Sequence, residues 1–316
     1  MLALAPFPRN GHIMTVSTPS LDRRGLTLAL STYAIWGILP VYFHFLTGVP
    51  ALQVVAHRVI WSAPLLIAVV LLLGRGRATL AAARGRTLLL LVASSALIAI
   101  NWLVYIWAVQ NGHVLEGSLG YFINPLVNVA LGIAVLGERL RKWQGIAIGV
   151  AGLGVAAMAL SGGGSIWISL VLAASFGLYG LLRKIAAIDA LGGLTVETVL
   201  LAPLCIAWLL YSAAHDATGF GQSLTLDALI LLAGVVTAIP LLMFAAAARR
   251  LPLSTMGLIQ YLAPSLQFGL ALLFGEPLRP VHFVVFPLIW AGCALYAWDS
   301  VRAVRAPAPE DIKPVG

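Results

Sequence analysis

Charged residues are scarce in this chain of 316 residues. Only 9% of the residues are charged, whereas 61% are hydrophobic; an ordinary soluble domain has roughly 25% charged residues. A water-soluble fold of this size cannot bury so much apolar surface, because its surface is too large relative to its core. A lipid bilayer removes this constraint, and each helical crossing takes about 20 apolar residues. The composition therefore predicts an all-α polytopic membrane protein.

Motifs of several enzyme classes are also absent. The sequence has no H-E-x-x-H, no G-x-S-x-G and no paired aspartates, so no metal site and no convergent acid–base pair are expected. A membrane-embedded enzyme that acts on a lipid or polyprenyl substrate is kept as the alternative function. The glycine run 162–164 lacks the Lys-Ser/Thr ending of a phosphate loop. No cofactor is expected, and any active transport must use an ion gradient or an exchange.

Basic residues outnumber acidic residues by 19 to 11, which gives a formal net charge of +8. They form short clusters at the ends of apolar runs rather than a stripe or a tail, so nucleic acid is not expected as a partner. Membrane lipids and a small-molecule substrate are the expected partners. The sequence leaves open whether the chain forms a homodimer.

Ten apolar runs are long enough to cross a membrane. They cover residues 26–46, 50–73, 87–109, 113–136, 142–160, 165–182, 193–212, 227–248, 253–274 and 280–299. When the connecting segments are assigned alternately to the two sides, 17 of the 19 basic residues fall on the side of the N-terminus. Because loops rich in Lys and Arg stay in the cytoplasm, we expect cytoplasmic tails at 1–24 and 301–316.

Landmarks of the first half recur in the second half. The paired landmarks are Pro64 with Pro203, Pro125 with Pro264, and Glu138 with Glu276. The two proline pairs are 139 residues apart and the glutamates are 138 apart, which predicts a repeat over residues 25–160 and 161–300. Each half holds five spans, so the second half enters the membrane from the opposite side. Inverted repeats are typical of secondary transporters that work by alternating access.

Specific strings of the sequence resemble a known family. They are Tyr33-Ala34-Ile35-Trp36-Gly37, His57-Arg58-Val59-Ile60-Trp61-Ser62, Asn101-Trp102, and the run 117–128 that contains Gly120-Tyr121-Phe122-Ile123-Asn124-Pro125. From about residue 26 to 300 the chain resembles the RarD proteins of the EamA family, a branch of the drug/metabolite transporter superfamily. The resemblance implies ten helices in two inverted five-helix repeats, a central cavity, and export of small molecules across a bacterial inner membrane.

Two ionisable residues lie deep inside predicted spans. Arg58 comes six residues before Pro64, and Glu197 comes six residues before Pro203. The repeat therefore makes them counterparts that enter from opposite faces. Charged residues inside a membrane span are costly and usually functional. Either they form an ion pair between the halves, or they line the cavity, with Arg58 attracting an anionic or polar group and Glu197 exchanging a proton.

Other candidates complete the predicted site. Polar and aromatic residues that either join helices or line a substrate-binding cavity are Asn101, Trp102, Tyr105, Tyr121, Asn124, Gln260 and Tyr261. His57 is a further substrate-binding or proton-relay candidate, although it points about 100° away from Arg58 on a helix. Glu116 is a second proton-coupling candidate. Pro125 and Pro264 would bend their helices, and we treat them as candidate hinges.

Overall fold

A computed structural model describes residues 22–136, 141–161, 165–215, 218–251, 256 and 259–305. Within these residues every regular element is a helix, and nine helices are long and apolar enough to cross a membrane. These are α1 (Arg23–His44), α2 (Ala51–Leu72), α4 (Gly85–Gln110), α5 (Val114–Leu136), α6 (Lys142–Leu160), α7 (Ile166–Ile185), α8 (Ala190–Ala214), α9 (Leu224–Ala248) and α12 (His282–Arg305). The prediction of an all-α polytopic membrane protein is confirmed.

Two shorter helices differ from the predicted spans. The helix α3 (Gly76–Ala82) lies in the connection between α2 and α4, where only a loop was expected. The helix α11 (Leu262–Leu273) covers the second part of the predicted span 253–274. Much of the first part of that span, and the Gly-Glu pair at 137–138, lie outside the described residues. Ten crossings in two inverted repeats therefore stay a prediction.

Pro125 and Pro264 affect their helices differently. Proline has no N–H to donate to the carbonyl one turn earlier. Pro264 lies in the first turn of α11, directly after a turn at Gln260 and Tyr261. Pro125 instead lies within α5, which runs without interruption from Val114 to Leu136. An interruption thus precedes α11, whereas α5 continues past Pro125, and the role of both prolines as hinges stays a prediction.

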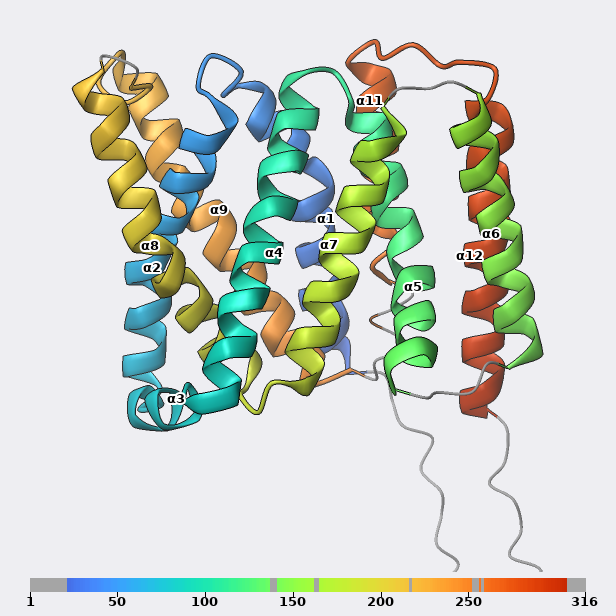
Figure 1. Ribbon diagram of the computed structural model, residues 1–316, viewed down its shortest axis with the longest axis horizontal. Coiled ribbons are helices and arrows are strands. Elements are labelled where there is room, and N and C mark those ends of the chain that lie inside the picture. The colour runs from blue at the N-terminus through green and yellow to red at the C-terminus, as the bar shows by residue number, and fades with distance from the viewer. Residues whose placement is uncertain are drawn as a thin grey trace, which may run out of the picture.

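The helices stand side by side, and the chain runs up and down through them (Figure 1). The first residues of α1 and the last residues of α12 lie at the same edge. The ends of helices at this edge carry Arg23, Arg24, Arg75, Arg77, Arg84, Arg86, Arg141, Lys142, Arg183, Lys184, Arg249, Arg250 and Arg302. We call it the basic edge. The opposite edge carries Arg279, in the connection between α11 and α12.

Ion pairs tie helix ends together at the basic edge. Arg250 pairs with Asp22 at 3.3 Å, and Arg75 pairs with Asp189 at 3.8 Å. A third pair joins Arg141 and Asp299 at 2.7 Å, so α6 is held to α12. At the opposite edge the bonds that are described are mostly neutral, as in the amide of Gln110 donating to two carbonyls of the α1–α2 connection at 2.8 and 2.9 Å.

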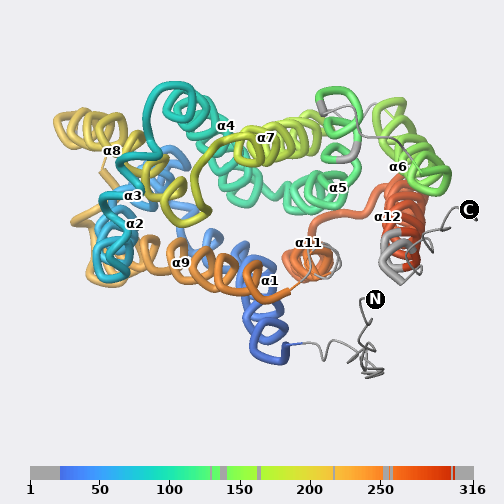
Figure 2. Tube along the Cα trace, turned by 90° about the horizontal axis from the view of Figure 1, so that it is seen from below, coloured from blue at the N-terminus to red at the C-terminus, as the bar shows by residue number. Residues whose placement is uncertain are grey.

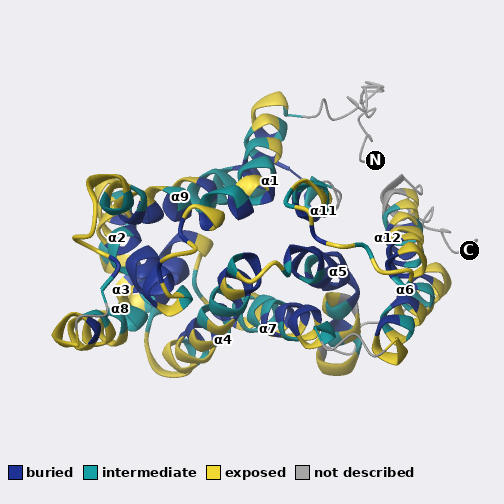
Figure 3. Cartoon of the chain, turned by 90° about the horizontal axis from the view of Figure 1, so that it is seen from above, coloured by how far each residue is buried: buried dark blue, intermediate teal, exposed yellow. Residues whose placement is uncertain are grey.

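Seen along the helix axes, the helices form two rows (Figure 2). One row contains α2, α9, α1 and α11, and the other contains α4, α7 and α5; α6 and α12 pair at one end. Buried residues gather on the faces that the rows turn toward each other, and exposed residues lie on the outside (Figure 3). Exposed residues include large aliphatic ones such as Leu210 and Leu273. Such outer faces are those expected of helices in contact with lipid.

Small residues let the helices approach closely, and these contacts occur in matched pairs. A Cβ added to Gly37 of α1 would lie 2.6 Å from Leu266 of α11, and one added to Gly177 of α7 would lie 2.6 Å from Val127 of α5. Gly37 and Gly177 are 140 residues apart, and Val127 and Leu266 are 139 apart. Each of these two contacts joins a residue of one half to a residue of the other, and exchanging the halves converts one contact into the other.

The helices α6 and α12 also make close glycine contacts that form a matched pair. A Cβ added to Gly154 of α6 would lie 3.1 Å from Ile289 of α12, and one added to Gly292 of α12 would lie 3.0 Å from Ala151 of α6. Both the two glycines and the two partners are 138 residues apart. A two-fold axis that exchanges the halves of the chain would produce this arrangement.

Candidate functional site

Arg58 is held between the two rows. It comes seven residues after Ala51, the first residue of α2, and thus about 10 Å along the helix from the opposite edge. The residue is only 6% exposed. Its Nε donates to the hydroxyl of Thr237 in α9 at 2.9 Å. Its guanidinium carbon lies 4.6 Å from the ring centre of Trp102 in α4 and 5.3 Å from that of Phe43 in α1.

Tyrosine rings extend this aromatic surrounding. The ring of Tyr105 meets that of Phe43 edge to face at 6.1 Å, and Tyr121 of α5 lies against Tyr105 at 5.3 Å. The Tyr121 hydroxyl donates to Asn101 at 3.1 Å, and the Asn101 amide donates to a carbonyl and a hydroxyl of α7 at 3.1 and 3.0 Å. Asn101 therefore joins two helices and orients Tyr121. We call Arg58, Phe43, Trp102, Tyr105, Tyr121 and Thr237 the Arg58 site.

Several buried polar atoms of α2, α4, α5 and α11 and of the turn before α11 have no hydrogen-bond partner among the described residues. They are Nη1 of Arg58, the hydroxyls of Tyr105 and Tyr261, Oδ1 of Asn124 and Oε1 of Gln267. Buried polar atoms are nearly always hydrogen-bonded. Other buried atoms without a described partner, such as Nη1 of Arg183, lie elsewhere, whereas Nη1 of Arg58 and the Tyr105 hydroxyl belong to the Arg58 site and are suited to receive a bound molecule there.

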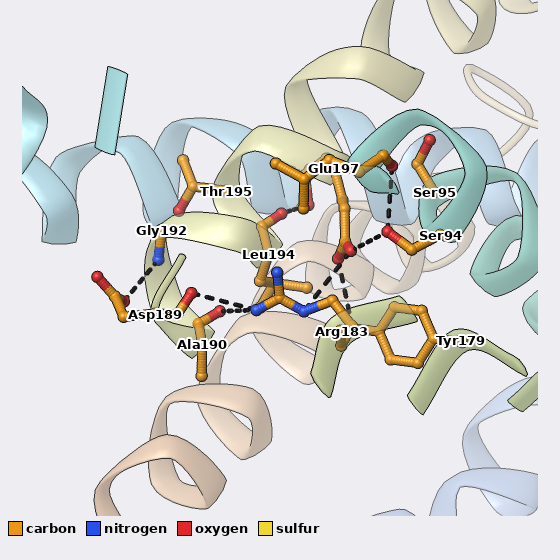
Figure 4. Close-up of polar contacts among 12 residues, drawn as sticks. Ser94, Ser95, Tyr179, Arg183, Asp189, Ala190, Gly192, Leu194, Thr195 and Glu197 are labelled. Carbon is orange, nitrogen blue, oxygen red and sulfur yellow. Dashed lines mark hydrogen bonds and ion pairs between the residues drawn. The ribbon is translucent and has the colours of Figure 1, made fainter. Parts of the chain in front are cut away.

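Glu197 lies in a second polar cluster (Figure 4). It comes seven residues after Ala190, the first residue of α8, and thus lies in the half of the molecule nearer the basic edge. The residue is 1% exposed. Its carboxylate accepts hydrogen bonds from Ser94 of α4 at 2.5 Å and from Tyr179 of α7 at 3.3 Å. Nε of Arg183 lies 3.7 Å from the same carboxylate. We call Glu197, Arg183, Ser94 and Tyr179 the Glu197 cluster.

Backbone groups fix Arg183 in this cluster. Its Nη2 donates to the carbonyls of Asp189 and Ala190 at 3.1 and 3.2 Å, just where α8 begins. The guanidinium lies over Gly193, and a Cβ at that position would be 1.6 Å from Nη1. Only glycine leaves room for the guanidinium here, so the sequence Gly192-Gly193 is part of the reason that Arg183 reaches Glu197.

The hypothesis of an ion pair between Arg58 and Glu197 is wrong. The carboxylate binds Arg183 instead, and among the described residues Arg58 has no carboxylate within ion-pair distance. In the sequence, Arg183 counts only as one of the 17 basic residues on the side of the N-terminus. A sequence signal for its role did exist, because Tyr179 and Arg183 are four residues apart and share one face of a helix.

His57 faces away from the Arg58 site. Its ring stacks on Phe220 at 5.8 Å, and it lines a groove of about 280 Å³ with Trp61 and side chains of α8. Both ring nitrogens are buried and have no partner in the part of the chain that the structure describes. The structure thus separates His57 from the other predicted substrate-binding residues, as the 100° step between neighbouring helical residues requires.

The acidic residues at the opposite edge meet at the start of α5. Both carboxylate oxygens of Glu276 accept backbone N–H groups, from Val114 at 2.6 Å and from Leu115 at 2.8 Å. Burial raises the pKa of Glu276, and the two backbone donors oppose that rise. Glu116 lies 3.6 Å from His113. Glu276 therefore caps a helix, while Glu116 lies at this edge, away from the Arg58 site.

The other candidates lie on α5 and at the start of α11. Asn124 and Pro125 are buried in α5, whereas Gln260 and Tyr261 are half-buried just before α11. The ring of Tyr261 stacks near that of Phe122 at 6.3 Å. Of the predicted set, the structure brings Trp102, Tyr105 and Tyr121 close to Arg58. In the described part of the chain, no group of three or more His, Cys, Asp or Glu side chains is arranged to hold a metal.

Comparison with known proteins gives the relationships of this chain. The profile of the EamA-like transporter family matches residues 23–160. An uncharacterized transporter of Pseudomonas aeruginosa is 47% identical over 287 residues, which are 90% of this chain and 96% of that protein. Protein RarD of Escherichia coli is 42% identical over 287 residues, which are 90% of this chain and 97% of that protein.

A solved crystal structure shares the fold. Its TM-score is 0.58 at 18% sequence identity, and the match covers 88% of this chain and 98% of that chain. This likeness concerns the fold alone. The sequence relatives are identical at more than 40% of positions over nearly their full length. The chain is therefore a multi-pass membrane transporter that belongs to the RarD proteins of the EamA family.

Proposed function

We propose that this protein is a secondary active transporter that exports small molecules across a bacterial inner membrane by alternating access. The substrate occupies the space between the two rows of helices and contacts the Arg58 site. The observation that carries this proposal is the Arg58 site itself, a buried guanidinium with a donor that no described protein group uses. Ionisable residues inside membrane spans are costly to bury, and they usually mark functional sites.

Matched contacts in the two halves support alternating access. α1 packs against α9 and α11 as α7 packs against α4 and α5, and each close glycine contact between the halves has a counterpart with the halves exchanged. Two inverted repeats can exchange their conformations. A transporter that is closed at one edge can then open there and close at the opposite edge with little difference in free energy. We therefore keep residues 25–160 and 161–300 as the proposed repeats.

The basic edge is proposed to face the cytoplasm, because loops rich in Lys and Arg are retained there. The Arg58 site then lies in the outer half of the membrane and the Glu197 cluster in the inner half. Parting α7 from α8 at the basic edge would remove Arg183 from Glu197. A buried carboxylate without its counter-ion favours protonation, so Glu197 is the proposed site of proton coupling, with Glu116 as the second candidate.

Flux into reconstituted vesicles tests the function. The full chain is placed in liposomes, a proton or sodium gradient is imposed, and uptake of amino acids, nucleobases and hydrophobic drugs is followed. We expect at least one compound to move with the proton gradient, and its flux to stop when a protonophore is added. Turnover of a lipid substrate without gradient-sensitive flux of any compound would instead favour the membrane-embedded enzyme.

A further inference from the structure

The positive charge of Arg58 has no counter-ion among the described residues. Its nearest groups are the Thr237 hydroxyl and the rings of Trp102 and Phe43. Its Nη1 is buried, and no described residue accepts a hydrogen bond from it. Of the ion pairs in the described residues, none includes Arg58. A guanidinium keeps its proton at physiological pH, so a full charge is held here.

Aromatic rings and one hydroxyl compensate only part of the cost of burying this charge. Cation–π contacts and a hydrogen bond to a neutral group are each modest contributions. The cost of removing one ion from water is larger, unless an opposite charge comes with it. A bound anion would supply the missing compensation, and the energy released would appear as binding affinity.

The neighbouring donors define the shape of that anion. Nη1 of Arg58 and the Tyr105 hydroxyl are both buried without a partner in the described part of the chain, and the ring of Phe43 contacts both side chains. A carboxylate has two oxygens, one for each of these donors. Trp102 and Tyr121 are half-buried, so their rings offer surface against which a flat apolar group can lie.

Arg58 supplies the positive charge of the Arg58 site, whereas the basic residues His57 and Arg183 face other parts of the molecule. His57, the neighbour of Arg58 in sequence, faces Phe220 in a separate groove. Arg183 is bound to Glu197 and to two carbonyls in the other half of the molecule. A single guanidinium balances a monoanion, whereas a phosphate group with two charges would be left with one unpaired charge.

From these observations we infer that the Arg58 site binds small organic monocarboxylates with a planar apolar body. This inference rests on the transport function proposed above and names the class of its substrate. The carboxylate bridges Arg58 and Tyr105, and the planar body lies against Trp102 and Tyr121. Neutral and cationic analogues of the same shape bind less well, because they leave the guanidinium uncompensated.

Equilibrium binding to the purified full chain in lipid nanodiscs tests the inference without any gradient. The probes are matched pairs, benzoate with benzamide and nicotinate with nicotinamide, together with benzylamine as a cation. Because a charged hydrogen bond is stronger than a neutral one, at least one carboxylate should bind roughly tenfold to a hundredfold more tightly than its amide. If no carboxylate binds better than its amide, or if benzylamine binds best, the inference is overturned.

Substitutions assign the binding to named groups. Arg58→Gln should abolish the preference for carboxylate over amide. Arg58→Lys should keep part of it, because an ammonium retains the charge but not the planar fork. Tyr105→Phe should weaken carboxylate binding about threefold to tenfold and leave amide binding unchanged. Arg250→Gln is the matched control, since this exposed arginine pairs with Asp22 at the basic edge.

Each outcome of these variants decides something. If Arg58→Gln does not fold, Arg58→Lys and Tyr105→Phe carry the test. Carboxylate preference that survives undiminished in both of them overturns the inference. Gradient-driven flux of neutral compounds with no carboxylate binding would remove the inference and leave the transport function. Carboxylate binding without gradient-driven flux of any compound would remove the transport function and leave the binding site.

Discussion

Arg58 and Glu197 occupy equivalent places in the two halves, and their charges are stabilised in different ways. Each comes seven residues after the first residue of its helix. Each is bonded to a hydroxyl on a neighbouring helix, Thr237 of α9 for Arg58 and Ser94 of α4 for Glu197. Glu197 also has a counter-ion in Arg183, whereas Arg58 has aromatic rings. The two halves therefore share a helix arrangement and differ in chemistry.

The difference follows from one helix in each half. In α7, Tyr179 and Arg183 point to Glu197. Gly37 of α1 and Gly177 of α7 are equivalent and 140 residues apart, so the counterparts in α1 are Leu39 and Phe43. Leu39 has no polar side-chain group, and Phe43 offers Arg58 a ring, whose centre lies 5.3 Å from the guanidinium carbon, instead of a charge. In the Arg58 half, α1 thus supplies no equivalent of the Glu197 cluster, which leaves the charge of Arg58 for a ligand.

The largest expected effect is on the Glu197 cluster. Arg183→Met leaves a buried carboxylate without a counter-ion and should lower the free energy of unfolding by about 3–5 kcal/mol. Arg183→Met with Glu197→Gln should recover most of this loss, because no charge is then left unpaired. Unfolding by denaturant in mixed micelles measures both. A double variant no more stable than Arg183→Met would show that the two residues do not act as a pair.

Gly193→Ala should act on the same cluster with a smaller effect. The added methyl group displaces the guanidinium of Arg183, which we expect to cost about 1–3 kcal/mol of unfolding free energy. In Gly152→Ala, the control, the new Cβ has no neighbour within 4 Å, and stability should be unchanged or rise slightly. Equal effects of the two substitutions would mean that Arg183 moves away from Gly193 at no cost.

In the Arg58 site, a substitution that removes the charge should stabilise the protein rather than destabilise it. Arg58→Met removes an uncompensated charge and fills most of its volume, so the free energy of unfolding should rise by about 1 kcal/mol. Carboxylate binding should be lost in the same variant. The measurement is denaturant unfolding, compared directly with Arg183→Met. A loss as large as that of Arg183→Met would show that the protein itself supplies a counter-charge to Arg58, and the contrast between the two halves would fail.

The smallest effect concerns Glu276, another buried carboxylate, which is balanced by backbone N–H groups rather than by a guanidinium. Burial raises its pKa above the ordinary value of 4.5, with a further rise from Glu116 and opposing effects of the backbone donors and His113. A raised carboxyl pKa means that the folded state binds the proton more tightly. Its stabilising contribution is therefore full below pH 4.5 and is lost as pH rises through the folded pKa.

Glu276→Gln cannot titrate, so it isolates this contribution. The thermal unfolding midpoint of the native chain, measured relative to that of Glu276→Gln, should fall as pH rises from the ordinary carboxyl pKa to neutral pH, by at most about 4 °C. A difference that is constant, or that grows with pH, would contradict the assignment and would mean that the helix cap outweighs burial.

Much of the fold was predictable because it depends on local composition. The limits of nine long helices agree with apolar runs to within a few residues, and the basic residues gather at one edge as the alternation of spans predicted. The short helix α3 was not predicted, because seven residues carry too little periodicity. The interruption before α11 follows from Pro264, yet the same residue type at Pro125 leaves α5 continuous.

The site was predictable only as a set of candidates. Sequence spacing placed Arg58 and Glu197 at equivalent depths, and that placement agrees with the structure. The spacing did not predict which side chains contact Arg58 and Glu197. Arg183 counted only among the basic residues that flank the spans, Asn101 was left open between joining helices and lining a cavity, and His57 was a binding or proton-relay candidate that points away from Arg58. Each depended on which neighbouring helix faces the side chain, and that is a property of helix packing.

The sequence by itself determined that this is a membrane protein, where its helices run, and that two opposite charges lie buried in its two halves. These properties depend on hydrophobicity and on residue spacing, which are local. Only the tertiary structure decided that Glu197 has its counter-ion, whereas Arg58 has none among the described residues. The choice rests on α7 presenting Arg183 to Glu197 over Gly193, while α1 presents the ring of Phe43 to Arg58. Contacts between distant segments, rather than the segments themselves, distinguish the two centres.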